Sequence, residues 1–354
     1  MEGILRKKVS KGLIYMIIEY KGQKIETKHY TPITDDEYIK LKNDYFAKPT
    51  LEQVKDQLYQ ISRNGGQVNK ITAYYYKDLM AKVKLYSCKW SVEEVFECKD
   101  LVSFFVSKTE ENKNVFTDDM SLVEKVSRAI QIGGKGCALP PTQFPLKTID
   151  MILNLYNING NYYDFSCGWG IRLLGALKHR INYFGTDPNY LLTERLNQMA
   201  NDYKSVVRNN SSVDIRTQGS QYFIPEWENK IGLAFSSPPY FYLEDYKIGD
   251  QSYKEGTSYT DWKSNYLKPT FENIYKYLTN NGYFLLNINN FDTFKLVEDS
   301  IDIAESIGFH LVGEHLLTQI KRVNSKGEFN DNSERILVFN KDASKQSKQV
   351  SRLF

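Results

Sequence analysis

The second half of this sequence alternates short apolar runs with amphipathic stretches, and this alternation constrains the fold more than any other feature. Runs such as NYYDFSC and INYFGTD predict strands, and stretches such as IRLLGALKHR predict helices. Strands joined by a helix pair in parallel, because the helix returns the chain to the same end of the sheet. The last two runs, FHLVGEHLL and SERILVFN, have no helix between them, so one of them should pair antiparallel. We predict an α/β fold whose mostly parallel sheet is covered by helices on both faces.

The first 130 residues follow a different pattern. A β-hairpin is predicted over residues 12–31, and helical patterns follow it to about residue 106. A connector rich in glycine and proline, GGKGCALPPTQFP, then leads into the alternating region. A chain of 354 residues is expected to form two domains. We predict an α+β N-terminal domain over residues 1–130, an α/β domain over residues 131–340 and a basic, flexible tail over residues 341–354.

The composition excludes several classes of protein. The net charge of +3 and the 25% of charged residues are ordinary for a globular protein and do not by themselves indicate a polyanionic partner. The four cysteines form no CxxC pair and the chain has only four histidines, so we predict neither a metal site nor a disulfide framework. The apolar run GLIYMII near the start is too short for a signal peptide or a membrane span. A cytoplasmic protein with no membrane contact is expected.

Two segments at predicted strand ends indicate a nucleoside site. In DFSCGWG, residues 164–170, a strand leads through Gly168 and Gly170 into a helix, and glycines allow backbone amides to approach a ligand closely. Asp187 ends the next strand, 17 residues after Gly170, where an acid binds ribose hydroxyls in nucleoside-binding α/β folds. The third glycine of a dinucleotide fingerprint is missing, so nothing argues for a pyrophosphate-containing cofactor. The alternative is that these residues only form tight turns.

A pair of prolines marks a third strand end. Proline lacks the N–H group that a sheet ladder needs, so the strand-like run IGLAFSS must end before Pro238 and Pro239. The prolines would leave the Pro238 carbonyl pointing outward, without a partner in the sheet. Taken alone, this segment is more simply a proline-stiffened strand cap. In open parallel sheets, however, ligands bind beyond the carboxyl ends of the strands, where all three segments lie.

Together these segments resemble the S-adenosylmethionine-dependent methyltransferases that act on the exocyclic amino group of DNA bases. The motif SPPY, residues 237–240, resembles their (Ser/Asn/Asp)-Pro-Pro-(Tyr/Phe/Trp) catalytic signature, and the serine form is typical of N4-cytosine enzymes. Residues 164–170 are similar to their cofactor loop, D-P-F-x-G-x-G, with Phe165 in place of the proline. The stretch LPPTQFPLKTIDMIL, residues 139–153, resembles the segment before that loop, with Phe144 where a lysine is usual. The resemblance covers roughly residues 131–340.

The resemblance implies a Rossmann-like methyltransferase fold with a seven-stranded sheet, and S-adenosylmethionine as the cofactor. The catalytic residues that it implies are Ser237, Pro238, Pro239 and Tyr240. The cofactor-binding residues are Thr142, Asp164, Phe165, Ser166, Cys167, Gly168, Gly170, Asp187, Pro188 and Ser220. Related enzymes often have an acid at the position of Ser220 to bind the adenine amino group, so Ser220 or Gln221 is expected to replace it. Phe165 could equally be a plain core aromatic residue.

The implied chemistry explains the residue types. An amino group on an aromatic base is a poor nucleophile, because its lone pair is delocalised into the ring. Acceptors aimed at its N–H groups, here the Ser237 side chain and the Pro238 carbonyl, favour a tetrahedral nitrogen. Tyr240 would stack on a base that has left the duplex. Methylation at carbon 5 of cytosine would need a cysteine beside a proline, and no Pro-Cys dipeptide occurs. The cofactor segment precedes SPPY, whereas many N4-cytosine enzymes have the reverse order, so adenine stays open beside cytosine.

A basic and aromatic segment predicts a surface for DNA. Residues 62–90 hold six basic residues and one acid, with tyrosines between them, and residues 1–30 hold seven basic residues and three acids. If residues 70–86 are helical, Lys70, Tyr74, Lys77 and Lys84 share one face. We predict that these four residues and Phe241, next to the SPPY motif, contact nucleic acid. A solvated helix face is the equally plain alternative.

The expected activity is site-specific methylation of cytosine N4 or adenine N6 in DNA, with cytosine slightly favoured, in a restriction–modification or phage modification system. The alternatives are an RNA or protein-glutamine amide methyltransferase and a catalytically inactive nucleic-acid-binding subunit. The C-terminus, QVSRLF, closes a polar tail with Leu353 and Phe354 and resembles sliding-clamp binding peptides. A sliding clamp is therefore a second expected partner.

Overall fold

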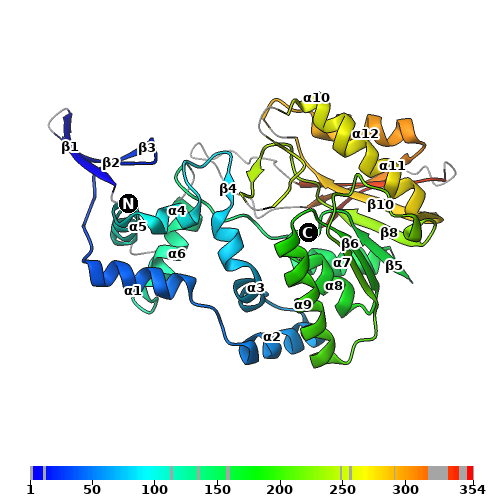
Figure 1. Cartoon of the computed structure of the whole chain (residues 1–354), viewed down its shortest axis with the longest axis horizontal. Helices are drawn as coiled ribbons and strands as arrows, with labels where there is room; N and C mark the ends of the chain where they lie inside the picture. The colour runs from blue at the N-terminus through cyan, green and yellow to red at the C-terminus, as the bar shows by residue number, and fades with distance from the viewer. Residues whose placement is uncertain are drawn as a thin grey trace. The chain divides into compact units, whose positions relative to one another are not determined.

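The computed structural model describes residues 3–10, 13–111, 115–133, 136–156, 160–247, 249–254, 257–290, 292–317, 334–342 and 349–353. The chain divides into two compact units, whose elements are labelled in Figure 1. The first unit comprises residues 1–51, 72–142 and 244–248, and the second comprises residues 52–71, 143–243 and 249–354. None of the described helices is both long enough and apolar enough to cross a membrane.

The second unit is built on one large sheet, to which the described residues contribute eight strands. Their order is β13 (Gln349–Leu353), β11 (His310–Leu317), β12 (Glu334–Asn340), β10 (Leu278–Ile288), β8 (Ile231–Ser236), β5 (Asn161–Asp164), β6 (Asn182–Thr186) and β7 (Val213–Arg216). Strand β12 runs antiparallel to β10 and β11, and the other neighbouring pairs are parallel. All seven strands that the sequence predicts are present, so the predicted α/β fold with a mostly parallel sheet is confirmed.

The eighth strand comes from the C-terminal tail. Strand β13 pairs in parallel with β11, with Leu353 opposite Leu317. The prediction of a flexible tail is therefore wrong for residues 349–353, because the edge of β11 offers unpaired backbone groups to a further strand. Phe354 lies outside the described residues, and the sliding clamp stays a prediction.

Helices lie on both sides of this sheet (Figure 1). On one side are α11 (Lys268–Tyr277) and α12 (Leu296–Ile307), and on the other are α7 (Leu146–Leu155), α8 (Ile171–Lys178) and α9 (Tyr190–Val207). Short helical elements between β7 and α11 are η1 (Pro225–Trp227), α10 (Tyr259–Trp262) and η2 (Lys263–Leu267). Helices α7 and α8 approach closely because residue 175 is glycine: a Cβ there would lie 2.2 Å from Ile149 Cγ2.

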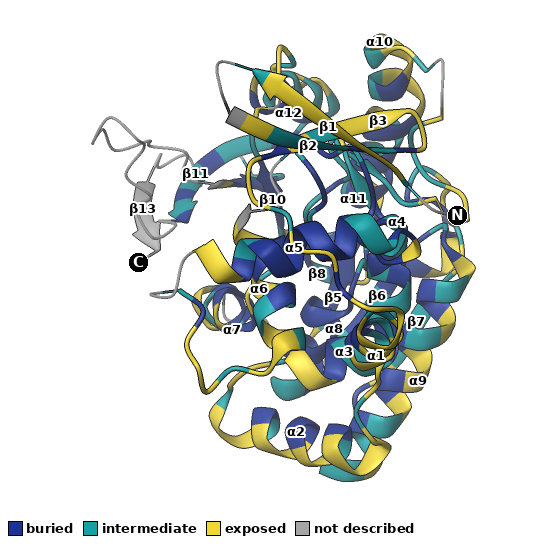
Figure 2. Cartoon of the chain, turned by 90° about the vertical axis from the view of Figure 1, so that its left-hand side faces the viewer, coloured by how far each residue is buried: buried dark blue, intermediate teal, exposed yellow. Residues whose placement is uncertain are grey.

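The central strands are buried on both faces, as Figure 2 shows by colour. The neighbouring residues Tyr162 and Tyr163 of β5 are both fully buried, although successive side chains of a strand point to opposite faces. The ring of Tyr163 packs edge-on against Tyr277 of α11. The ring of Tyr162 contacts Tyr183 of β6, and its hydroxyl donates to the Phe235 carbonyl at 2.7 Å. Burial of both faces explains why these strands are continuous apolar and aromatic runs in the sequence.

The first unit combines a small antiparallel sheet with helices, as predicted. The sheet has the order β1 (Ile4–Ser10), β2 (Leu13–Tyr20), β3 (Gln23–Thr27), so the predicted hairpin is β2 and β3, and β1 is an addition. The helices are α1 (Asp35–Phe46), most of α3 (Asn69–Lys82), α4 (Val92–Glu97), α5 (Lys99–Glu111) and α6 (Leu122–Gly133). Their common core includes Leu41, Phe96 and Phe105, which are almost fully buried.

The boundary between the units differs from the predicted one at residue 130. Residues 131–142 belong to the first unit, and nearly all of α2 (Leu51–Asn64) belongs to the second. Helix α2 buries Val54, Leu58 and Ile61 on one face, so it must pack against a core. A short strand, β9 (Glu244–Asp245), pairs with β4 (Lys84–Leu85) within the first unit, although the segments on either side of it in the sequence belong to the second. Pairings between distant segments of this kind leave no local signal in a sequence.

Candidate active site

The loop after β5 has the conformation that its glycines make possible. Gly168 and Gly170 have φ angles of 52° and 75°, in the left-handed region that other residues adopt only at a cost. Gly170 directly precedes α8, so the loop leads into the N-terminus of that helix. Free backbone N–H groups at such an end can donate to a polar ligand. The predicted Gly-x-Gly loop is therefore present at the carboxyl end of β5.

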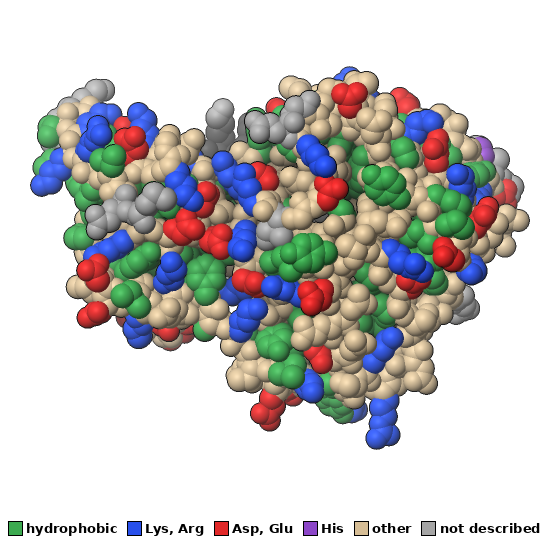
Figure 3. Space-filling view, viewed as in Figure 1, with side chains coloured by type: hydrophobic (Ala, Val, Ile, Leu, Met, Phe, Trp, Pro, Cys, Tyr) green, Lys and Arg blue, Asp and Glu red, His purple; other side chains and the backbone are tan. Residues whose placement is uncertain are grey.

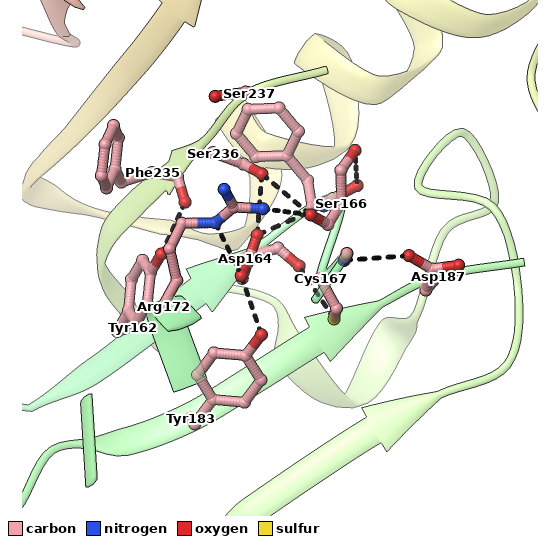
Figure 4. A network of polar contacts seen from close by, with 12 residues as sticks. Tyr162, Asp164, Ser166, Cys167, Arg172, Tyr183, Asp187, Phe235, Ser236 and Ser237 are labelled. Carbon is pink, nitrogen blue, oxygen red and sulfur yellow. Dashed lines mark hydrogen bonds and ion pairs between the residues drawn. The ribbon is translucent and has the colours of Figure 1, made fainter. Parts of the chain in front are cut away.

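Asp164, the last residue of β5, is completely buried and anchors this loop (Figure 4). One carboxylate oxygen accepts from Arg172 Nε at 2.9 Å and from the Tyr183 hydroxyl at 2.8 Å. The other accepts from the Ser236 hydroxyl at 2.7 Å and from the Ser166 backbone N–H at 3.4 Å. Because both oxygens are occupied and buried, the carboxylate stabilises the loop from within. The resemblance implies a direct contact between this side chain and the cofactor, but both carboxylate oxygens already accept hydrogen bonds from the protein.

Arg172 is the partner that lets Asp164 be charged in the interior. Its guanidinium group is almost fully buried and donates both to Asp164 and to the Ser166 carbonyl. A buried carboxylate is costly unless it is paired and hydrogen-bonded, and here both conditions hold. Sequence reasoning missed Arg172, because an arginine on a predicted amphipathic helix is normally a surface residue.

Asp187 directly follows β6, as predicted, and its carboxylate reaches the glycine loop. It accepts from the Gly168 N–H at 3.2 Å and from the Asn189 N–H at 3.0 Å. Burial raises the pKa of Asp187 to about 6, although these two backbone donors lower it in part. A carboxylate has about four acceptor positions, so two of them stay available for ligand hydroxyl groups. The arrangement fits the predicted ribose contact.

The side chains of Phe165 and Cys167 face inward from the same loop. Phe165 is 1% exposed and packs against Phe284, so it is the core aromatic residue that the sequence left as an alternative. Cys167 is also buried, and its thiol lies so close to Gly185 that a Cβ there would meet Sγ at 2.6 Å. Burial raises the pKa of Cys167 well above that of a free thiol, so this residue is a packing group and not a nucleophile.

After β7, Gln221 is better placed than Ser220 to replace the missing acid. Ser220 is buried, and its hydroxyl is hydrogen-bonded to that of Thr270 at 2.9 Å. The side chain of Gln221 folds over Gly219, where a Cβ would lie 2.2 Å from Oε1. In the described part of the chain, this buried Oε1 has no hydrogen-bond partner. An unpaired buried acceptor is costly, so Gln221 Oε1 is suited to accept from a ligand.

A buried tyrosine that sequence reasoning missed lies beside the loop. Tyr266, from η2, brings its hydroxyl to 3.4 Å from Ser166 Oγ. Burial raises the pKa of Tyr266 to about 12, so its hydroxyl stays protonated at neutral pH. Position 266 lies about 100 residues from the loop in the sequence, so only the fold brings the two together.

The SPPY segment lies at the carboxyl end of β8, which ends at Ser236 as predicted. Ser237 Oγ accepts a hydrogen bond from Asn287 Nδ2, on β10, at 2.8 Å. The Tyr240 hydroxyl donates to the Asn287 carbonyl at 3.4 Å. Among the described residues, none donates to the carbonyl of Pro238. The two prolines thus leave one carbonyl oxygen unpaired beside a serine, and sequence reasoning missed the asparagine that holds that serine.

The segment before the glycine loop packs against the sheet through Phe144. Phe144 packs edge-on against Phe235 of β8, with the ring centroids 5.6 Å apart. Pro188 is half-buried beside Asp187. Thr142 is exposed and is the last residue of its segment in the first unit, and its contact with the cofactor stays a prediction.

The four residues predicted to share one helix face do not all lie on one helix. Helix α3 ends at Lys82, so Lys84 lies in β4 and not on the helix face with Tyr74. The ammonium group of Lys77 lies 4.3 Å from the centroid of the Tyr45 ring, and burial lowers the pKa of this lysine. Lys70 is exposed and lies on α3 with Tyr74 and Lys77, so the nucleic-acid contact of these three residues stays a prediction.

The prediction that Phe241 contacts nucleic acid is wrong. It is 5% exposed and packs against aromatic rings that include Tyr253 and Phe294, so it has no surface to offer a base. Its φ of 51° turns the side chain inward from the SPPY segment. On the face shown in Figure 3, basic and acidic side chains are intermingled, and no single-sign patch stands out.

No protein-family model matches the sequence, and no curated protein matches it. Solved structures similar to the chain include a TehB-like S-adenosylmethionine-dependent methyltransferase from Corynebacterium glutamicum, at 15% identity and a TM-score of 0.35, covering 55% of this chain and 88% of that one. A second is magnesium protoporphyrin IX methyltransferase from Synechocystis with bound S-adenosylmethionine, at 10% identity and a TM-score of 0.38, covering 68% and 93%. A third is the [4+2]-cyclase SpnF, at 11% identity and a TM-score of 0.37, covering 58% and 81%.

Similarities at this level do not decide what the chain does. The fold is assigned from the sheet itself: parallel strands in the order β10, β8, β5, β6, β7, with the antiparallel strand β12 inserted between β10 and β11. A glycine loop follows the central strand β5, and an acid follows its neighbour β6. The chain has a Rossmann-like α/β fold with a mostly parallel sheet.

Proposed function

We propose that this protein transfers a methyl group from S-adenosylmethionine to the exocyclic amino group of a DNA base, with cytosine N4 ahead of adenine N6. The observation that carries the proposal is the SPPY turn at the carboxyl end of β8. Its Pro238 carbonyl has no donor in the described part of the chain, and its Ser237 hydroxyl lies beside it. The turn is joined to the glycine loop by the bond between Ser236 and Asp164. Donor and acceptor loops are thus neighbours.

The residues around the glycine loop fit S-adenosylmethionine, which when bound supplies a methyl group on a positively charged sulfur. Asp187 offers carboxylate oxygens to the ribose hydroxyls. Gln221 Oε1, which is buried without a partner in the described part of the chain, offers an acceptor to the adenine amino group. The backbone of residues 166–170 can follow the ligand closely, because Gly168 and Gly170 adopt positive φ.

The SPPY residues act on the other reactant. The Ser237 hydroxyl and the Pro238 carbonyl accept from the N–H groups of the target amine, which localises the nitrogen lone pair. The half-buried ring of Tyr240 stacks on the flipped base, an interaction of about 1–3 kcal/mol. No charged base is needed, because positioning alone supplies up to about 7–11 kcal/mol in well-oriented reactions. The role of the chain is therefore to hold a neutral amine in line with the methyl group.

A substrate panel tests the proposal. The full chain is incubated with S-adenosylmethionine labelled in its methyl group and, separately, with unmethylated DNA made by amplification, total RNA and glutamine-containing peptides. The proposal expects label in DNA alone, and at least a hundredfold less in Tyr240→Ala, since base stacking and positioning are lost together. Label in RNA or peptide, with none in DNA, would show that the protein methylates another class of substrate. DNA binding with no transfer to any substrate would indicate an inactive subunit.

A further inference from the structure

We propose that Asn287, on β10 beside the SPPY turn, selects an amino group as the methyl acceptor; this inference rests on the proposed function. The side chain of Asn287 is 3% exposed, so almost none of it reaches solvent. Its Nδ2 donates to Ser237 Oγ at 2.8 Å, whereas its Oδ1 has no hydrogen-bond partner in the described part of the chain. Buried polar atoms without a partner are rare in native proteins and need an explanation.

The position of Asn287 at the sheet edge supplies that explanation. Strands β8 and β10 pair in parallel with Ser236 opposite Leu286, so Ser237 and Asn287 follow at the same end of the sheet. The backbone carbonyl of Asn287 also accepts from the Tyr240 hydroxyl. Both side chains proposed to handle the base therefore meet this one residue. The unpaired Oδ1 belongs to the same side-chain amide whose Nδ2 donates to Ser237 Oγ, so it lies close to the polar atoms of the SPPY turn.

Another buried asparagine in the same sheet shows that an unpaired amide is not the rule here. Asn340, at the end of β12, is fully buried, yet its Nδ2 donates to the Gly282 carbonyl at 2.9 Å and its Oδ1 accepts from the Asp342 N–H at 2.7 Å. Asn340 pairs with Tyr283, four residues before Asn287 on β10 and about 13 Å away along the strand. The unpaired amide is thus at the proposed site and not at the opposite end of the strand.

An unpaired acceptor discriminates between substrate groups. An exocyclic amino group carries two N–H donors: one can go to the Pro238 carbonyl, and the other can be shared between Ser237 Oγ and Asn287 Oδ1. Ser237 Oγ accepts from Asn287 Nδ2, which uses one of its two acceptor positions, so Oδ1 adds a second acceptor for this N–H. A keto oxygen would face these acceptors with lone pairs, and a site built for hydrogen bonds strongly rejects a group that lacks them. Asn287 adds no covalent step: it positions the amine and excludes oxygen acceptors.

The test compares two targets in one DNA duplex. Once methyl transfer by the wild type has identified the base and its site, binding is measured for a duplex with that base and for one in which the base lacks only its amino group. The latter is 2-pyrimidinone for cytosine, or purine for adenine. Relative to the duplex without the amino group, the wild type should bind the amino-bearing duplex about tenfold more tightly than Asn287→Leu does, because the cheaper flipping of the weakened base pair affects both proteins equally. In Asn287→Leu, which is similar in size but apolar, kcat should also fall.

Two further variants separate positioning from folding. Asn287→Asp keeps an acceptor, so the preference for the amino-bearing duplex should return. Asn340→Leu is the matched control: it loses a paired amide and stability, but the preference should persist. Methyl transfer by the wild type with an unchanged preference in Asn287→Leu would overturn the inference alone. No methyl transfer to DNA by the wild type would overturn the proposed function and the inference with it.

Discussion

Ser236 Oγ lies 2.7 Å from Asp164 Oδ1, so the residue before the SPPY turn is hydrogen-bonded to the last strand residue before the glycine loop. Both residues are completely buried, and they end the neighbouring strands β8 and β5. The same hydroxyl lies 3.3 Å from the Ser166 carbonyl. The two segments proposed to bring methyl donor and acceptor together are therefore fixed to each other below the reacting groups.

Replacing Ser236 with alanine should loosen both segments at once. The change removes one donor from a buried carboxylate oxygen, which costs about 1–3 kcal/mol of folding free energy. Urea denaturation should show this loss, and kinetics should show a higher KM for S-adenosylmethionine together with a lower kcat. Ser205 is an exposed serine on α9 and provides the matched control, because Ser205→Ala should change neither. Normal kinetics in Ser236→Ala would mean that the bond does not couple the segments.

Cofactor affinity should depend on pH through Asp187. Burial raises the pKa of this carboxyl to about 6, and only the ionised form offers all its acceptor positions to ribose hydroxyls. The Kd for S-adenosylmethionine, measured by calorimetry, should therefore be constant at neutral pH and rise as the pH falls through about 6. In Asp187→Ala the Kd should be high and should no longer depend on pH in this range. The same pH dependence in Asp187→Ala would assign the titration to another group.

The stability of the unliganded protein should show the opposite trend. The folded pKa of Asp187 lies above its value in the unfolded chain, so its contribution is fully present below about pH 4 and is lost as the pH rises through about 6. The lost contribution is about 3 kcal/mol, because each pKa unit corresponds to about 1.4 kcal/mol. Denaturation curves should show the wild type losing stability relative to Asp187→Ala over this interval. Parallel pH profiles of the two proteins would contradict the raised pKa.

The packing of Gly185 against Cys167 predicts a stability defect that a second change should relieve. A Cβ at residue 185 would lie 2.6 Å from Cys167 Sγ and 2.7 Å from the Tyr183 ring, so Gly185→Ala should cost about 1–3 kcal/mol. Adding Cys167→Ala removes the sulfur and should recover part of this cost. Thermal denaturation of the two single variants and the double variant gives the coupling. Strictly additive effects would mean that the two side chains do not meet.

Gln221 should contribute to recognition of the adenine ring. Its unpaired Oε1 is proposed to accept from the adenine amino group, so Gln221→Leu should weaken binding of S-adenosylhomocysteine about tenfold. S-inosylhomocysteine has a keto oxygen in place of that amino group and should bind the wild type less tightly. In Gln221→Leu the two ligands should bind with similar affinity. A persisting preference for the adenosyl ligand would assign this contact to another residue.

The parts of this protein that could be predicted from its sequence are those with a local cause. Apolar runs predicted the strands, and two glycines predicted the loop that leads from β5 into a helix. The prolines correctly placed the end of β8. Arg172 and Asn287 could not be found in this way, because each functions through a partner on another strand or loop. Parallel pairing brings such residues together at one edge of the sheet, and neither residue type is unusual where it stands in the sequence.

The wrong predictions also have local physical reasons. Extending the periodicity of α3 to residue 86 placed Lys84 on a helix face, although the helix ends at Lys82 and the next residues pair with β9. Phe241 looked exposed because it follows two prolines, but its positive φ directs the ring into a cluster of aromatic residues. The tail looked disordered because it is polar, yet a strand at a sheet edge needs only backbone groups to pair.

If an amino group of a DNA base receives the methyl group, the product is found in the nucleosides of the methylated DNA. These are measured by mass spectrometry of unmethylated DNA after incubation with the full chain and S-adenosylmethionine. We expect N4-methyldeoxycytidine or, in its place, N6-methyldeoxyadenosine, and the loss of either product in Ser237→Ala. The appearance of 5-methyldeoxycytidine, or of no methylated nucleoside, would contradict this expectation.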